Sequence, residues 1–133
     1  HDMKEYIPEL GRTLGEELLT PTRIYVKDVM PVIRRVKSIA HITGGGFWEN
    51  IPRALPDGLS AKIDTRKIKV PPIFDVIMSA GDIQREEMFH VFNMGVGMML
   101  VCERDDADFV AGAVNGAYVA GEIVEGEGGL LLC

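Results

Sequence analysis

The chain has 133 residues, with 14 Lys and Arg against 20 Asp and Glu, so its formal net charge is −6. A hydrophobic content of 47% and a charged content of 26% are typical of one soluble globular domain and exclude disordered and low-complexity classes. The acidic balance argues against a nucleic-acid binder, and no uncharged run reaches the ~20 apolar residues of a membrane span. Two cysteines are too few for a disulfide scaffold and favour a reducing cytoplasm.

The first half of the chain alternates weak and strong patterns. Residues 1–22 carry little periodicity and predict an irregular lead-in or linker, with an expression remnant at its start. Apolar residues spaced by three and four predict a helix over 26–39, despite Pro31. Residues 39–42 then predict a short buried strand, and 47–55 a short helix interrupted at Pro52.

Residues 61–102 show clearer boundaries. Alternating charged and apolar residues predict a half-exposed strand over 61–70. Prolines at 71 and 72 open a helix that ends at Gly81, and Asp82 is placed to cap the next helix, which runs to about Phe92. The apolar run 95–102 predicts a buried strand.

The last third predicts one helix and two strands. Asp105, Asp106 and Asp108 suit a helix start, and Asn115-Gly116 suits its left-handed end. Residues 117–125 and 130–133 predict closing strands joined by a glycine-rich turn. Because strands and helices mix without a strict βαβ order, the sequence predicts an α+β fold with a mixed sheet packed with helices.

The strongest local signal is a triple glycine between a strand and a helix. Gly44, Gly45 and Gly46 carry no Cβ, so a ligand can approach the backbone closely. The N–H groups at the following helix start have no internal partner and suit a phosphate. Thr43 is placed to cap the helix or to donate its hydroxyl to a phosphate oxygen. The spacing matches neither the Walker A loop nor the dinucleotide fingerprint, and a tight strand-to-helix turn is the structural alternative.

Four polar side chains near this turn have both a functional and a structural interpretation. His41 is either a proton donor or charge stabiliser, or a satisfied core histidine. Arg53 either clamps a phosphate or pairs on the surface with Glu49 or Asp57. Asn93 either orients a ligand or ends a helix in the left-handed conformation, whereas His90 favours a solvated ion pair with Glu86 or Glu87. The sequence has no histidine or cysteine spacing suited to zinc.

Four separated segments carry a family resemblance. They are His41-Ile-Thr-Gly-Gly-Gly46 with Glu49-Asn50-Ile51-Pro52-Arg53, Leu19-Thr-Pro-Thr-Arg-Ile-Tyr-Val26, Glu87-Met88 with Phe92-Asn-Met-Gly-Val-Gly97, and Gly121-Glu-Ile-Val124. Taken in chain order, they resemble aminoimidazole ribonucleotide synthetase, or phosphoribosylformylglycinamidine cyclo-ligase, over about residues 14–130. Phe47-Trp48 departs from the family, where aliphatic residues are commoner after the glycines.

The resemblance implies a domain division and an activity. Residues 1–13 are then a tag remnant and lead-in, and residues 14–133 are the C-terminal domain of the synthetase-like fold, without the N-terminal domain. The full enzyme implied is a cytoplasmic homodimer that converts formylglycinamidine ribonucleotide and ATP to aminoimidazole ribonucleotide, ADP and phosphate, with Mg²⁺ ligands in the N-terminal domain. This chain alone is expected to be inactive. Alternatives are another enzyme of the superfamily or a non-catalytic phosphate- or nucleotide-binding module.

The resemblance also implies site residues. Arg23 and Thr22 are weaker candidates for the cleft between the domains. The expected catalytic residue is His41, and the expected substrate- and phosphate-binding residues are Thr43, Gly44, Gly45, Gly46, Arg53 and Asn93.

Overall fold

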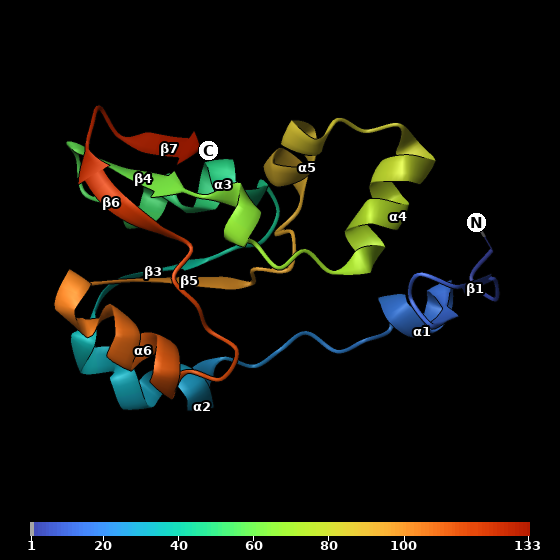
Figure 1. Cartoon of the computed structure of the whole chain (residues 1–133), viewed down its shortest axis with the longest axis horizontal. Coiled ribbons are helices and arrows are strands. Elements are labelled where there is room, and N and C mark those ends of the chain that lie inside the picture. The colour runs from blue at the N-terminus through green and yellow to red at the C-terminus, as the bar shows by residue number, and fades with distance from the viewer. Residues whose placement is uncertain (1) are drawn as a thin grey trace.

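A two-stranded ribbon crosses the middle of the computed structural model, which describes residues 2–133 (Figure 1). Strand β3 (Val36–His41) pairs antiparallel with β5 (Met98–Cys102), and Ile39 lies opposite Leu100. This pairing joins segments about 60 residues apart, so it fixes which loops meet at each end of the ribbon.

A three-stranded mixed sheet lies beside the ribbon (Figure 1). Its central strand β4 (Leu59–Ile63) pairs antiparallel with β6 (Gly121–Glu125) and parallel with β7 (Gly129–Leu132). Together with the helices around both sheets, this arrangement confirms the predicted α+β class with a mixed sheet.

Three helices lie near one end of the ribbon. Helix α3 (Gly46–Asn50) packs against α5 (Arg85–Val91), and α4 (Pro72–Gly81) precedes α5. Helix α4 has ten residues, and among residues 2–133 no helix is long and apolar enough to cross a bilayer. The other helical segments are α1 (Leu14–Leu18), α2 (Val26–Val29), η1 (Met30–Arg35), η2 (Pro52–Ala54), η3 (Thr65–Lys67), η4 (Arg104–Asp106) and α6 (Ala107–Ala113).

The main core lies between α3, α5 and the strands. Phe47, Met88 and Phe89 are buried there, and the rings of Phe47 and Phe89 meet edge to face 5.2 Å apart. Burial of one such ring contributes roughly 1.5–3 kcal/mol, so this contact fixes α3 on α5. A smaller cluster of Val32, Val110 and Val114 holds η1 against α6.

The N-terminal segment has more structure than the sequence indicates. Strands β1 (Tyr6–Ile7) and β2 (Arg12–Thr13) form a short antiparallel pair, and Thr13 caps α1 in a capping box with Glu16. An extended stretch then crosses from α1 to α2, as Figure 1 shows.

The helix predicted over 26–39 is wrong over residues 36–39. The helical segments end at Arg35, and β3 begins at Val36 because the chain there pairs with β5. Of the predicted apolar stripe, Val29 is buried, whereas Val26, Met30 and Ile33 are exposed. Val32, which lies between positions of the stripe, is buried instead. Tertiary pairing overrides the local helical period.

All five predicted strands start or end at other residues than expected. The strand predicted over 61–70 ends at Ile63, because Asp64 accepts a hydrogen bond from the Arg66 N–H and begins η3. The strand expected over 95–102 begins at Met98 and is only half-buried, and the one expected over 117–125 begins at Gly121. Within residues 39–42 only Ala40 and Ile42 are buried.

The predicted role of Asp82 is also wrong. Helix α4 begins after Pro71 and reaches Gly81 as predicted, but the left-handed position that ends it falls on Asp82, with φ of 49°. Asp82 is therefore the C-cap of α4, and the N-cap of α5 is Gln84. Aspartate tolerates this conformation better than most residues with a side chain.

Candidate functional site

The ribbon brings two of the motifs together at one end. His41 ends β3 directly opposite Met98, which begins β5, and the Ile42 N–H donates to the Gly97 carbonyl at 2.9 Å. The residues after His41 and the residues before Met98 therefore leave the ribbon side by side. We call residues 43–46 the glycine loop; it leads directly into α3 (Figure 1).

The three glycines of the loop occupy different environments. Gly45 and Gly46 have φ of 85° and 54°, a region that disfavours residues with a Cβ. A Cβ on Gly46 would overlap the Phe89 carbonyl oxygen of α5, so this glycine allows α3 and α5 to approach closely. A Cβ on Gly44 would meet no atom within 4 Å, so neither φ nor packing requires glycine there.

The Asn50 side chain holds the loop from the inside. Its amide Nδ2 lies 2.7 Å from the Gly46 carbonyl oxygen, 3.1 Å from that of Gly44 and 3.4 Å from that of Thr43. In residues 2–133, the N–H groups of Gly44 and Gly45 donate to no other residue. The loop therefore presents unpaired donors on an exposed turn, which is the chemistry that an anion requires.

Thr43 does not cap α3. The N-cap is Gly45, which has no side-chain capping bond, and the Thr43 carbonyl accepts from the Gly46 N–H at 3.1 Å. The predicted capping role is wrong because the turn places the helix start two residues later. The exposed Thr43 side chain stays a candidate donor to a phosphate oxygen.

Arg53 forms a surface ion pair with Glu49, which was the structural interpretation of this residue. Its Nη2 lies 3.1 Å from Glu49 Oε2, and both side chains are largely exposed. The Glu49 carboxylate also covers Gly45, since its Oε2 lies 2.6 Å from the position of a Cβ there. A negative group thus lies beside the loop, and Arg53 balances it.

Asn93 shapes the neighbouring loop. Its Oδ1 accepts from the Gly95 N–H at 3.0 Å, and its carbonyl accepts from the Val96 N–H at 2.8 Å. The left-handed residues are Met94 and Gly95, so the predicted left-handed role of Asn93 itself is wrong. A hydrogen-bonded turn of this kind is the usual local role of asparagine.

His41 is exposed and contacts the segment that enters the domain. Its ring lies edge-on to Tyr25 with centroids 6.3 Å apart, and the Arg23 guanidinium lies 5.1 Å from the Tyr25 ring centroid. A Cβ on Gly97 would overlap the Tyr25 hydroxyl, so the glycine at 97 leaves room for this ring. Arg23 also donates to the Asn115 carbonyl at 2.7 Å, and Thr22 is exposed.

Tyr25 is the residue of this group that the sequence reasoning missed. It was visible only as one letter of the segment ending at Val26, with no chemical signal of its own. The structure places its ring between His41 and the 93–97 loop, so it supports His41 from the side.

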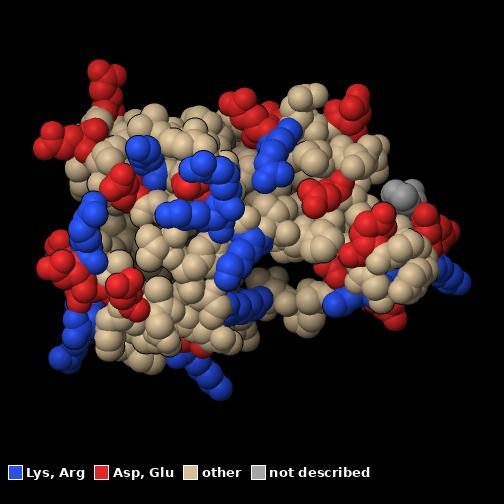
Figure 2. Space-filling model, in the orientation of Figure 1, with Lys and Arg blue, Asp and Glu red and all other residues tan. Residues whose placement is uncertain are grey.

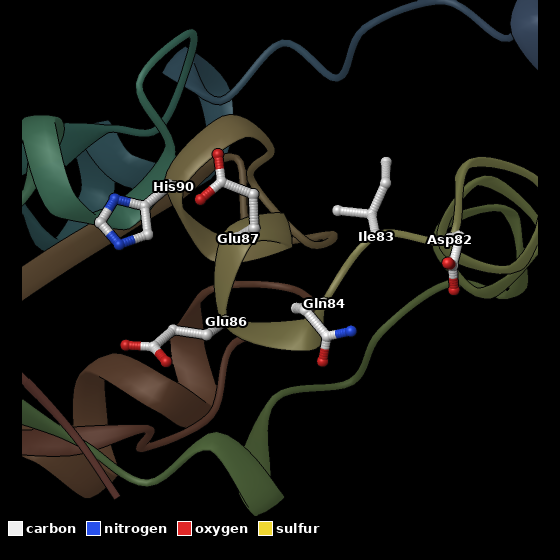
Figure 3. Close-up of a pocket in the computed structure, with 6 residues that line it drawn as sticks. All are labelled: Asp82, Ile83, Gln84, Glu86, Glu87 and His90. Carbon is white, nitrogen blue, oxygen red and sulfur yellow. The ribbon is translucent and has the colours of Figure 1, made fainter.

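His90 makes a ring contact instead of the predicted ion pair. It stacks on Trp48 with centroids 4.7 Å apart and an interplanar angle of 2°, and within residues 2–133 no carboxylate pairs with it. Figure 3 shows His90 with Glu86 and Glu87 of α5 at an open pocket next to the α4–α5 connection. The acidic rim of this pocket does not suit a phosphate.

Charged side chains and thiols indicate no second candidate site among the described residues. Figure 2 shows acidic and basic side chains interspersed over the visible face. In the described part of the chain, no three His, Cys, Asp or Glu side chains gather as a metal site. Cys102 and Cys133 are free thiols, and burial is the main cause that raises the pKa of Cys102.

Comparison with known proteins agrees with the motifs. A phosphoribosylformylglycinamidine cyclo-ligase of Thermoanaerobacter sp. (strain X514) is 49% identical over 98% of this chain. Proteins of the same name from Pseudothermotoga lettingae and Alkaliphilus metalliredigens are 47% and 42% identical over 96% and 100% of it. In each case the chain spans about 40% of the relative's length. The family model described as "AIR synthase related protein, C-terminal domain" matches residues 1–132, and the chain therefore belongs to this family.

Proposed function

We propose that this chain is the C-terminal half of an ATP-dependent cyclo-ligase of de novo purine biosynthesis. The proposed reaction converts formylglycinamidine ribonucleotide and ATP to aminoimidazole ribonucleotide, ADP and phosphate. The observation that carries the proposal is the 49% identity to a cyclo-ligase over nearly the whole chain. The meeting of the His41 and 93–97 motifs at one end of the ribbon supports it.

The chemistry needs an activated oxygen and a site for phosphate. An amide oxygen is a poor leaving group until ATP phosphorylates it; the amidine nitrogen then attacks the formyl carbon, and the C–O bond breaks with release of phosphate. The transferring phosphoryl group requires fixed donors and positive charge around it. The unpaired N–H groups of Gly44 and Gly45 and the hydroxyl of Thr43 supply such donors in this proposal.

His41 is the proposed catalytic residue. Its side chain is exposed at the end of β3, separated from the glycine loop by Ile42, and in this proposal it lies beside a ligand held by the loop N–H groups. In this position an imidazole stabilises negative charge on the activated oxygen or carries a proton between oxygen and nitrogen. Arg53, released from Glu49, is the proposed second cation.

The remaining parts of the proposal lie outside this chain. ATP-bound Mg²⁺ would be held by a preceding domain, as the resemblance to the cyclo-ligase implies. We place the whole enzyme, a homodimer in this proposal, in the cytoplasm, where free thiols such as Cys102 and Cys133 stay reduced.

A chimeric enzyme tests the proposal. The matched part of the Thermoanaerobacter relative is replaced by this chain, and formation of the aminoimidazole product and ADP is measured with ATP, Mg²⁺ and formylglycinamidine ribonucleotide. We expect turnover by the folded chimera and none by this chain alone. A folded chimera without turnover, beside an active parent, would contradict the proposal.

A further inference from the structure

The Asn50 side chain is hydrogen-bonded to the glycine loop, whereas Gly45, the N-cap of α3, has no side chain that could cap the helix. It ends α3, one turn after Gly46, and its amide reaches the carbonyls of Thr43, Gly44 and Gly46 at 3.4, 3.1 and 2.7 Å. Its two N–H groups thus reach three carbonyls of the loop, of which that of Thr43 also accepts from the Gly46 N–H. A hydrogen bond of this kind contributes about 0.5–1.5 kcal/mol.

The direction of these carbonyls fixes the direction of the donors. In a planar trans peptide the N–H of each residue points away from the preceding carbonyl. Carbonyls of Thr43 and Gly44 that face Asn50 therefore turn the N–H groups of Gly44 and Gly45 to the opposite side. Within residues 2–133, neither of these two N–H groups donates to another residue.

We propose that Asn50 is a positioning residue that aims the Gly44 and Gly45 N–H groups at a bound phosphate. It acts through the backbone and does not touch the phosphate, because its amide is occupied on the inner side of the loop. The inference rests on the proposed function of the loop. Packing of Gly46 against α5 fixes only the base of the turn, so the part around Gly44 depends on Asn50.

Two substitutions and a matched control test this. Asn50→Ala removes the donors, and Asn50→Asp keeps the shape but replaces donors by an ionised acceptor facing three carbonyls. The control is Asn115→Ala, at an exposed loop position whose backbone carbonyl accepts from Arg23 and whose side chain has no hydrogen-bond partner within residues 2–133. N–H residual dipolar couplings of Gly44 and Gly45 report orientation, and titration with inorganic phosphate reports affinity.

We expect both Asn50 variants to change these couplings and to weaken phosphate binding about tenfold, whereas the control changes neither. In Asn50→Asp the couplings should return toward the parent values as the pH falls to about 4, because the protonated carboxyl again donates one hydrogen bond. Asn50→Ala should show no such pH dependence, which separates positioning from a general loss of packing.

The positioning role of Asn50 and the proposed anion site are contradicted by different results. Couplings in Asn50→Ala that match the parent would overturn the role of Asn50, whatever phosphate does. Absence of phosphate binding by the parent chain would instead contradict the proposed anion site. The couplings alone would then decide whether Asn50 orients the two N–H groups.

Discussion

The glycine loop (residues 43–46) and the C-terminal glycine turn (residues 126–129) have nearly the same composition but different surroundings. In the loop, Gly46 is buried against α5 and Asn50 binds three carbonyls. In the turn, Gly128 and Gly129 also have positive φ, yet a Cβ on either would meet nothing within 4 Å. Glycine content alone therefore predicts only a bend. The contacts of the loop with Asn50 and α5 distinguish the candidate site from the turn.

The largest effect is expected at His41. In the chimera, His41→Ala should lower kcat by about 10²–10⁴-fold, because it removes the proposed acid–base group. Its free energy of unfolding should change by less than about 1 kcal/mol, since the ring is exposed. Glu127→Ala, in the C-terminal glycine turn, is the control and should leave kcat unchanged. Equal kcat values for the two variants would remove His41 from the mechanism.

The second effect concerns stability. Gly46→Ala should lower the free energy of unfolding by about 3 kcal/mol or more, because the residue has φ of 54° and its Cβ would overlap the Phe89 carbonyl. Gly128→Ala, with φ of 90° in open space, should cost only about 1–2 kcal/mol. Urea unfolding measures both. Similar losses would mean that packing on α5 does not distinguish the loop from the turn.

These contrasts show what could be predicted from the sequence. Local signals predicted α4 between its prolines and Gly81, and the strand–loop–helix order around the glycines. The pairing of β3 with β5 could not be predicted, because it joins distant segments and overrides the helical spacing after Arg35. For the same reason the sequence did not indicate that the residues after His41 lie beside the 93–97 loop.

Side-chain roles were predicted less well than element order. The sequence offered two partners for Arg53 but could not show that Glu49 would also cover Gly45. It assigned His90 to an ion pair, whereas the packing of α3 on α5 places the ring on Trp48. In the sequence, Asn50 had no predicted role beyond its place in a motif, because its hydrogen bonds depend on the direction of the Thr43, Gly44 and Gly46 carbonyls.

A smaller effect is expected at Glu49. Glu49→Gln removes a negative charge beside Gly45 and frees Arg53, so inorganic phosphate should bind about two- to fivefold more tightly at low salt. The gain should shrink as the salt concentration rises. Glu127→Gln serves as the control at the other turn. Unchanged or weaker binding in Glu49→Gln would show that this carboxylate does not oppose an anion at the loop.

The smallest effect is expected at Asp64, which lies away from both turns, and concerns the dependence of stability on pH. A hydrogen bond from the Arg66 side chain is the main cause that lowers the pKa of Asp64. Its stabilisation is present above the ordinary aspartate pKa of about 3.9 and is lost as the pH falls through the lower pKa of the folded state. Asp64→Asn should therefore give a shallower loss of stability below pH ~4. An identical acid limb would contradict this.

The most direct test of the anion site compares the two turns in one experiment on the unmodified chain. Inorganic phosphate is titrated to millimolar concentration while the amide resonances of Gly44, Gly45, Gly128 and Gly129 are followed by NMR. The account predicts saturable shifts at Gly44 and Gly45 and none at Gly128 and Gly129. Unchanged resonances at Gly44 and Gly45, or equal shifts at both turns, would contradict it.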